Sequence, residues 1–300
     1  MTKISVFYRP EQSSDAANSF SPSAGKPAKV VADWLSRPEI ADHIQIQNFE
    51  PASDEVLCGA HDPAYVKGVL SGRIENGFGN HNLEIANSLR YTTGSLLAAA
   101  KHVLTERIDS DLKAAISPTS GFHHAGHAFG GGYCTFNGLI ATAVEVYRLG
   151  LAKHILILDM DQHYGNGTQD IIKKLGLDYI DHITACSSYD TAEEALDASL
   201  LLRNLPSRRT YDLVLYQAGA DIHVNDPLGG LLTTAQMKQR DANVFRGCIV
   251  QGTPIVWNLA GGYQRDKAGS IEPVLALHRQ TATQCLRYSG AYKNQQKEVE

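Results

Sequence analysis

Acidic and imidazole side chains with the spacing of a metal site follow one short apolar run. The run Ile155–Leu158 leads directly into Asp159, Asp161 and His163. In extended backbone, side chains two positions apart leave on the same side, so Asp161 and His163 can face one ion. Asp221, which follows another apolar run, can supply a third ligand. These oxygen and nitrogen donors suit Zn2+ best, although Fe2+ or Co2+ fits them too, and they leave room for water and a substrate carbonyl. We therefore expect an open, catalytic metal site.

The same aspartates have a simpler interpretation. Aspartate after a strand commonly caps the next helix, because its carboxylate accepts hydrogen bonds from free backbone N–H groups of the first turn. Asp159 and Asp161 stand in that position before a helical pattern at 167–175. From this stretch alone, capping and metal binding remain alternatives.

A histidine pair, His123 and His124, follows the apolar run Ala114–Ile116. Adjacent histidines are often incidental. Here they precede Gly126 and the glycines at 130–132, whose missing side chains allow close backbone approach to a ligand. A neutral imidazole can act as the base toward a water molecule at a metal. The context therefore favours a catalytic role for the pair.

A tyrosine follows two glycines at the end of a further apolar run. Ile255–Leu259 leads into Gly261, Gly262 and Tyr263. A phenol in this place can donate a hydrogen bond to a carbonyl oxygen that develops charge. The alternative is a tyrosine that packs beside a glycine turn.

Short apolar runs alternate with helical patterns along the chain. The runs predict parallel strands buried on both faces, at Ile4–Tyr8, Ala114–Ile116, Ile155–Leu158, Ile183–Cys186, Leu213–Tyr216 and Ile255–Leu259. Helices are predicted at 25–36, 62–71, 84–105, 137–149, 167–175, 191–204, 234–250 and 270–282. In such a fold the ligand site lies outside the carboxyl ends of the strands, where the motifs above are found.

This alternation, without a long linker, predicts an α/β fold with a mostly parallel central sheet and helices on both faces. We expect a single domain over residues 1–292 and a frayed polar tail over 293–300.

Composition narrows the class of protein. The chain has 300 residues, 43% hydrophobic and 20% charged, as in an ordinary globular enzyme. Its net charge of −5 provides no general attraction for nucleic acid or anionic membranes. No apolar stretch reaches the length of a membrane span, and the beginning of the chain does not resemble a secretory signal. The 5 cysteines are scattered without a C-x-x-C pair, which favours reduced thiols. We expect a cytoplasmic protein.

Together, the motifs resemble the histone deacetylase and acetylpolyamine amidohydrolase superfamily, whose fold is related to that of arginase. The resemblance runs from about His61 to Tyr263. Its segments occur in the family's order: His123-His124-Ala, Gly-Gly-Gly-Tyr-Cys-Thr-Phe-Asn137, Asp159-x-Asp161-x-His163-x-Gly-Asn166-Gly-Thr168, Gln217-Ala-Gly-Ala-Asp221, Asp226-Pro-Leu-Gly229 and Gly261-Gly262-Tyr263.

The resemblance implies a zinc-dependent amidohydrolase. Zinc, one ion per chain, would be bound by Asp161, His163 and Asp221. His124 would serve as general base and later as general acid, and Tyr263 would stabilise the oxyanion. The substrate would be an acyl amine, with acetyl as the expected acyl group, such as acetyl-lysine, an acetylpolyamine or a related small amide.

Further residues receive supporting roles from the same resemblance. His123 would assist electrostatically and hydrogen-bond the water at the zinc, while Asp159 would orient and polarise His123. Gly132 and Tyr133 would line the acyl-lysine tunnel.

The family also suggests a second ion. A potassium ion is common beside Asp159, Asp161 and His163, where backbone carbonyls hold it in part. The arginase relatives instead bind two manganese ions through an Asp-x-His-x-Asp pattern, which this chain lacks. A dinuclear manganese ureohydrolase, or a catalytically weak metal-containing binding protein on the same scaffold, is the alternative function.

The chain departs from the family's pattern in three places. Asn166 stands where many relatives have Asp beside the second histidine, so His124 would remain neutral more readily. The segment between Cys186 and Tyr211 is short, which predicts a wider substrate groove or one completed by another subunit of a homo-oligomer. His127 follows the histidine pair without a role that the family supplies.

Overall fold

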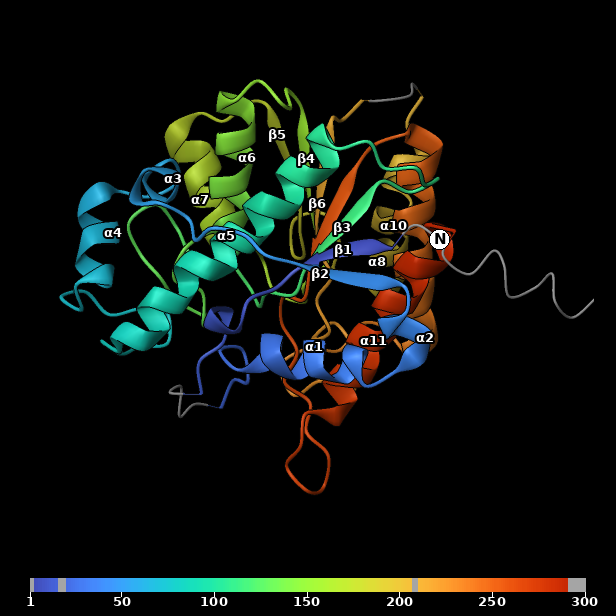
Figure 1. Cartoon of the computed structure of the whole chain (residues 1–300), viewed down its shortest axis with the longest axis horizontal. Helices are drawn as coiled ribbons and strands as arrows, with labels where there is room; N and C mark the ends of the chain where they lie inside the picture. Colours follow the sequence, from blue (N-terminus) through green and yellow to red (C-terminus); the bar gives the residue numbers. More distant parts are fainter. Residues whose placement is uncertain (1–2, 16–19, 207–209, 291–300) are drawn as a thin grey trace, which may run out of the picture.

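A seven-stranded parallel sheet forms the centre of the molecule in the computed structural model, which describes residues 3–15, 20–206 and 210–290 (Figure 1). Each neighbouring pair of strands in these residues is parallel, in the order β2-β1-β3-β7-β6-β4-β5. The strands are β1 Ile4–Phe7, β2 Ile44–Gln47, β3 Ala114–Ser117, β4 Ile155–Asp159, β5 Ile180–Ile183, β6 Leu213–Gln217 and β7 Ile255–Asn258.

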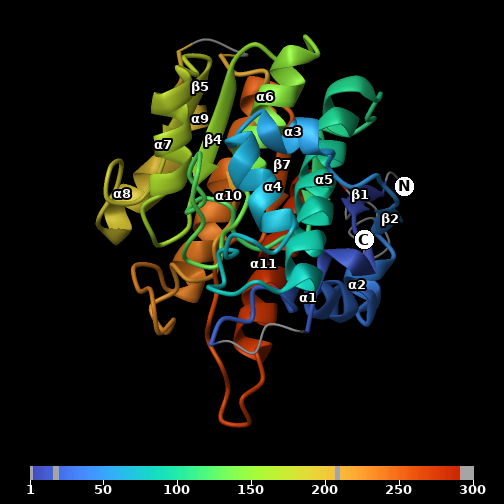
Figure 2. The ribbon, with the colours of Figure 1, turned by 90° about the vertical axis from the view of Figure 1, so that its left-hand side faces the viewer.

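Helices cover both faces of the sheet, as Figures 1 and 2 show. On one face lie α3 Asp54–Cys58, α4 Pro63–Leu70, α5 Leu83–Thr105, α6 Gly138–Arg148 and α7 Asn166–Leu175. On the other lie α1 Lys26–Leu35, α2 Pro38–Ala41, α8 Ala192–Ser199, α9 Leu201–Asn204, α10 Thr234–Gln251 and α11 Glu272–Tyr288. A short 3-10 helix, η1, spans Pro10–Gln12. The predicted α/β fold with helices on both faces is confirmed.

The alternating direction of side chains along each strand produces the two layers of the core. Leu156 and Leu158 of β4 pack in a cluster on the α10 and α11 side. Ile155 and Ile157 of the same strand pack in a second cluster on the α5 and α6 side. Successive side chains of a strand point to opposite faces, so a fully apolar strand fills both layers. Burial of each such side chain contributes about 1.5–3 kcal/mol.

The strand predicted at Ile183–Cys186 lies earlier in the chain, at Ile180–Ile183. This strand, β5, is an edge strand, and Asp181 in it is exposed, which interrupts the apolar pattern. After it, Ala185 forms an isolated bridge with Tyr189, and Cys186 has a left-handed φ of 59°. The backbone therefore turns where the apolar residues continue.

Strand β2 was not predicted. Its sequence alternates Ile and Gln, and it pairs with β1 at the other edge of the sheet. An edge strand need be apolar on one face only, so a search for continuous apolar runs passes over it.

The helix predicted at 191–204 is divided into α8 and α9, and the helix predicted at 270–282 extends to Tyr288. The tail 293–300 lies outside the described residues.

The described helices include none that is both long and apolar enough to cross a membrane.

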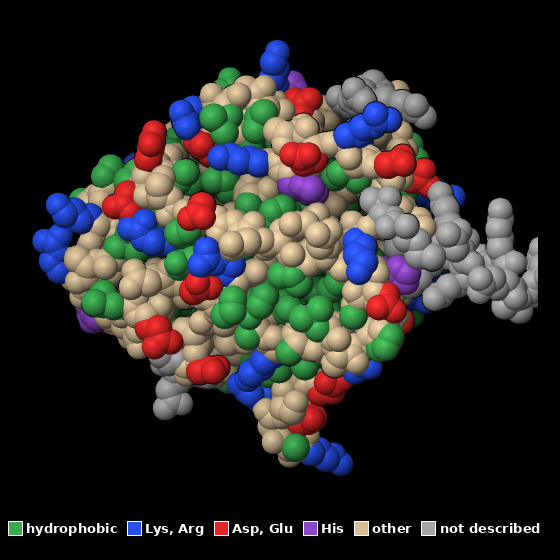
Figure 3. Space-filling view, viewed as in Figure 1, with side chains coloured by type: hydrophobic (Ala, Val, Ile, Leu, Met, Phe, Trp, Pro, Cys, Tyr) green, Lys and Arg blue, Asp and Glu red, His purple; other side chains and the backbone are tan. Residues whose placement is uncertain are grey.

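Figure 3 shows acidic and basic side chains interspersed on one face of the molecule. Hydrophobic side chains gather there over α1 and β2, from which Leu35 and Ile46 are exposed.

Candidate active site

The carboxyl ends of four neighbouring strands, β3, β7, β6 and β4, bring the predicted site residues together. Their order in the sheet is β3-β7-β6-β4, so the loops that follow them emerge side by side. The β3 loop carries the histidine pair, the β7 loop carries Tyr263, the β6 loop carries Asp221 and the β4 loop carries Asp161 and His163. Strand order, which the sequence does not state, is therefore what assembles the site.

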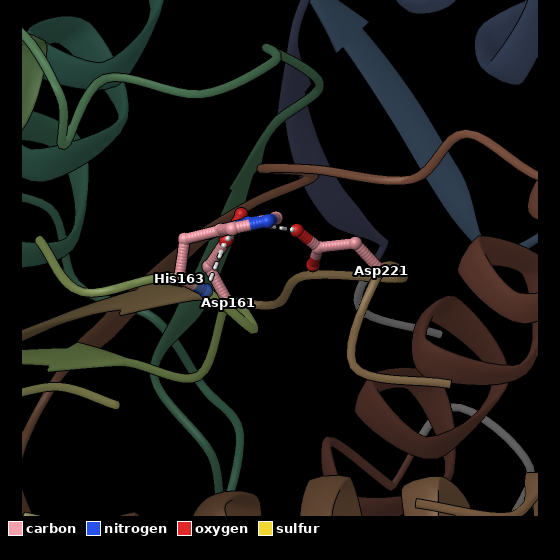
Figure 4. A group of neighbouring side chains, drawn as sticks. All are labelled: Asp161, His163 and Asp221. Atoms are coloured by element: carbon pink, nitrogen blue, oxygen red, sulfur yellow. Dashed lines mark hydrogen bonds and ion pairs between the residues drawn. The ribbon is translucent and has the colours of Figure 1, made fainter. Parts of the chain in front are cut away.

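Asp161, His163 and Asp221 form a compact group of ligand atoms that all lie within 4.8 Å of one another. Nδ1 of His163 is 3.1 Å from Oδ1 of Asp161 and 3.1 Å from Oδ2 of Asp221, and the three side chains converge in Figure 4. Both aspartates are buried, while His163 is partly exposed. Two buried carboxylates and one accessible imidazole are a donor set that fits zinc and leaves an open side for a substrate.

The reason these side chains meet differs from the one predicted. Residues 161–163 form bends and are not extended strand. The backbone N–H of His163 donates to Oδ1 of Asp161 at 3.0 Å, which folds the chain back on itself. The capping alternative is wrong for the helix that follows, because α7 has Gly165 as its N-cap and, within the described residues, no side chain caps it.

Close packing of charged groups controls ionisation in this group. Hydrogen bonds to Asp161 and then Asp221 raise the pKa of His163 to about 11. Burial, with the charge of Asp161 beside it, raises the pKa of Asp221 to about 7. Concentrated negative charge of this kind is unfavourable alone and is relieved by a divalent cation.

Gly261 is required for the approach of the two carboxylates. A Cβ atom at this position would lie 2.2 Å from Oδ2 of Asp221. The backbone N–H of Gly261 also donates to Oδ2 of Asp161 at 2.8 Å. Gly261, two residues before Tyr263, thus serves the metal group directly, through its missing side chain and its amide.

His123 is buried against Asp159 at the end of β4. Nδ1 of His123 is 2.7 Å from Oδ2 of Asp159, and Nε2 is 3.5 Å from Oδ1 of Asp161. Burial by itself would lower the pKa of His123, but the carboxylates of Asp159 and Asp161 outweigh it and raise the pKa to about 9. The two carboxylates therefore favour the protonated form of His123.

The pKa of His124 is shifted in the opposite direction to that of His123, although the two ring centroids lie only 4.1 Å apart. Burial and the positive charge of His123 lower its pKa below 6.5. Nδ1 of His124 lies 2.6 Å from Oδ1 of Asn166. Because that oxygen can only accept, Nδ1 carries the hydrogen and Nε2 is left as a proton acceptor.

Gly132 and Tyr133 lie beside His124 in left-handed backbone, with φ of 52° and 63°. A Cβ atom at Gly132 would lie 2.4 Å from Cδ2 of His124. The ring of Tyr133 is 6.2 Å from that of Tyr263.

Burial, and then the carboxylates of Asp221 and Asp161, raise the pKa of Tyr263 far above 10, so its hydroxyl remains a donor.

Two aromatic residues near the site were missed in the sequence. Phe20 stacks on Tyr263 with centroids 6.0 Å apart, and Phe78 contacts Tyr133 at 5.7 Å. Phe78 and Tyr133 also line a small cavity of about 20 Å³ together with Ser120 and Gly121. Phe20 is 52% exposed, so it offers an apolar face to an approaching substrate. No local pattern distinguishes these phenylalanines from core residues.

Lys26 was also missed, because a lysine in the first turn of a helix is ordinarily exposed. It is fully buried here, and its Nζ donates to the carbonyl oxygen of Ala260. Burial lowers the pKa of Lys26 to about 8, against the opposing effect of Asp221 and Asp161. It thus places a cationic group near the acidic cluster.

His127 makes contacts that connect the loop after β3 to neighbouring segments. Its backbone N–H donates to Asp170 at 2.9 Å, and its Nδ1 lies 3.0 Å from the carbonyl oxygen of Ala60. These contacts connect the loop after β3 to α7 and to the end of α3, so His127 holds the loop that carries the histidine pair.

Comparisons with known proteins identify the family and the fold of this chain. Residues 22–196 match the histone deacetylase domain family. The chain is 29% identical over 191 residues to histone deacetylase 2 of Arabidopsis thaliana, covering 56% of this chain and 49% of that protein. It is 50% identical over 54 residues to the acetylpolyamine amidohydrolase of Mycoplana ramosa, covering 18% of this chain and 16% of that protein. The crystal structure of the HDA15 HD domain superposes with a TM-score of 0.73 at 18% identity, covering 97% and 96% of the two chains, which shows a shared fold.

Proposed function

Because the chain belongs to the histone deacetylase domain family, we propose that it is a zinc-dependent amidohydrolase that removes an acetyl group from an amine. The observation that carries this proposal is geometric: the adjacent rings of His123 and His124, with centroids 4.1 Å apart, lie beside a three-ligand metal group, and Nε2 of His123 is 3.5 Å from Oδ1 of Asp161. An amide hydrolase needs a base for water and a stabiliser for the developing oxyanion, and this arrangement provides both.

Asp161, His163 and Asp221 would hold the zinc ion. When bound there, zinc polarises the amide carbonyl and lowers the pKa of water. Among the described residues this is the one group of three or more His, Cys, Asp or Glu residues with metal-site spacing, which favours a mononuclear enzyme over a dinuclear manganese ureohydrolase.

His124 moves the proton in this proposal. Its Nε2 takes a proton from the attacking water, because Nδ1 is bound to Asn166 and already carries a hydrogen. The same nitrogen then gives the proton to the nitrogen of the leaving amine. The lowered pKa of His124 keeps its ring neutral and ready to accept at neutral pH.

His123 and Tyr263 stabilise charge. The imidazolium of His123 is fixed by Asp159, so it can donate from Nε2 toward the attacking water without losing its proton. Tyr263 remains protonated and donates its hydroxyl to the oxygen of the amide as negative charge develops there.

The surroundings of Tyr133 and Tyr263 support the choice of substrate class. Tyr133, with Gly132 beside it, would line the passage for a linear amine, and the rings of Phe78 and Phe20, which contact Tyr133 and Tyr263, would extend the aromatic surface. We propose acetyl-lysine, an acetylpolyamine or a related small amide as substrate. The cytoplasmic location and a groove completed in a homo-oligomer remain predictions.

Hydrolysis by metal-free and zinc-loaded protein tests the proposal. Chelator-treated protein should be inactive, and one equivalent of zinc should restore hydrolysis of at least one member of a panel of acetyl-lysine peptides, acetylpolyamines and small acetyl amides. The His124→Ala variant, loaded with the same amount of zinc, is the matched control. Zinc binding without turnover of any member would contradict the proposal and favour a binding protein on the same scaffold.

A further inference from the structure

Tyr189 lies against the turn that carries Asp159 and the metal-site residue Asp161. Its side chain is buried, and its hydroxyl oxygen is 2.9 Å from the carbonyl oxygen of Asp159 and 2.8 Å from that of Asp161. A phenol has one proton, so it is shared between these two acceptors. Tyr189 is anchored in turn by the N–H of Cys186, which donates to its carbonyl oxygen at 2.9 Å.

The carbonyl of Met160, between Asp159 and Asp161, also faces a hydrogen-bond donor of the protein. Nη1 of the fully buried Arg240 lies 3.4 Å from the carbonyl oxygen of Met160 and 2.8 Å from that of Gly219. Three successive carbonyls of the turn, at 159, 160 and 161, therefore face the hydroxyl of Tyr189 or the guanidinium of Arg240. The guanidinium is itself paired with buried Asp241, whose Oδ1 lies 2.9 Å from Nε and 2.8 Å from Nη2 of Arg240.

The carboxylate of Asp159 is surrounded by side chains and backbone of the chain itself. Its Oδ1 accepts from Nε2 of Gln217 at 2.7 Å and from the N–H of Asp161 at 3.2 Å. Its Oδ2 lies 2.7 Å from His123 and 3.7 Å from Nε2 of His182, whose side chain is 2% exposed. Protein donors thus approach both oxygens.

This arrangement does not fit the potassium ion expected beside Asp159, Asp161 and His163. An ion held there by backbone carbonyls needs the space toward which those carbonyls point. The phenol oxygen of Tyr189 stands in that space, at hydrogen-bond distance from two of them. The carbonyl oxygens of Asp159 and Asp161, which would help to bind the ion, already accept hydrogen bonds from Tyr189.

We propose that the Tyr189 hydroxyl takes the place of a monovalent cation, so that the turn at 159–161 is positioned without potassium. Tyr189 is then a positioning residue: it fixes the two carbonyls, and through them the directions of the Asp159 and Asp161 carboxylates. The activity readout of this inference rests on the proposed function, whereas its stability readout does not.

The test compares cations at constant ionic strength. Zinc-loaded wild-type protein is transferred to tetramethylammonium chloride and titrated with potassium chloride, while Tm and the kcat for acetyl amide hydrolysis are measured. We expect Tm to change by no more than about 1 °C and kcat by less than about twofold, since a ligand that binds only the folded state raises Tm. A saturable, potassium-specific rise of several degrees, which sodium does not reproduce, would overturn the proposal.

Two variants of Tyr189 separate its hydroxyl from the space that it fills. Tyr189→Phe should lower kcat about tenfold with KM and zinc content retained, and potassium should not restore it, because the ring still fills the site. Tyr189→Ser opens the space, so potassium should raise its Tm and restore part of its kcat. An unchanged kcat in Tyr189→Phe, or a folded Tyr189→Ser that does not respond to potassium, contradicts the positioning role.

Tyr211→Phe is the matched control. It removes another tyrosine hydroxyl hydrogen bond, to Asp181 at 2.7 Å, from a residue outside the proposed site. It should lower Tm without changing kcat or creating a potassium response. If no preparation hydrolyses any amide but the Tm responses are as expected, the proposed function fails while the assignment of Tyr189 stands.

Discussion

Oδ1 of Asn166 lies 2.6 Å from Nδ1 of His124. The ring nitrogen that does not act as the proposed base therefore donates to an amide oxygen and not to a carboxylate. The amide orients the ring without adding negative charge. Combined with burial and the cationic His123, this leaves the pKa of His124 below its ordinary 6.5. The consequence is a base that stays neutral into the acidic range.

Asn166→Asp should therefore move the acid limb of kcat/KM to higher pH. A carboxylate favours the imidazolium form of His124 and raises its pKa, by roughly one unit. Since only the neutral ring accepts a proton, activity is lost below this higher pKa. The measurement is a pH profile of kcat/KM at equal zinc content, with Asn204→Asp, which adds the same charge at an exposed position of α9, as control. A limb that stays in place or moves to lower pH would mean that another group sets it.

Asp221→Ala should lose the metal, because one of three protein ligands is removed. Wild-type protein should contain one zinc per chain by elemental analysis after dialysis. Asp226→Asn is the control, since it also neutralises a buried carboxylate of the same loop, one that accepts from the N–H of Tyr263 and is outside the ligand group. Undiminished zinc in Asp221→Ala, or two zinc ions per wild-type chain, would refute the mononuclear assignment.

Tyr263→Phe should retain the fold and zinc but lose roughly 10²–10³ in kcat, as when one oxyanion donor is removed. The ring, which stacks against Phe20, remains, so KM should change much less. Steady-state kinetics on zinc-matched protein checks this. Near-normal turnover would leave Tyr263 with a packing role and assign the oxyanion to another donor.

Gly132→Ala should impair the base without removing the metal. The added Cβ would meet the His124 ring at 2.4 Å, and the backbone φ of 52° disfavours alanine. Displacement of the ring by a fraction of an ångström to 1 Å should lower kcat by about 10²-fold. Gly131→Ala is the matched control, because a Cβ there meets nothing within 4 Å. Equal activity of the two variants would show that close contact with His124 does not position it.

The sequence by itself indicated which residues form the candidate metal group. Asp161, His163 and Asp221 were identified from their types and from their places after apolar runs, and the structure brings their ligand atoms together. The prediction works because parallel strands align their carboxyl ends at one edge, so residues that follow different strands become neighbours. The family resemblance also placed Asn166 beside His124, and Nδ1 of His124 lies 2.6 Å from Oδ1 of Asn166.

Only the tertiary structure decided what surrounds those residues. Tyr189 reaches the carbonyls of Asp159 and Asp161 from the loop after β5, and Lys26 reaches Ala260 from α1. Neither residue has a local pattern that separates it from an ordinary core tyrosine or surface lysine. Their environment depends on how distant segments pack against the sheet. Hydrophobic periodicity sets which face of an element is buried, but the partner of a single buried polar group is set by the three-dimensional packing around it.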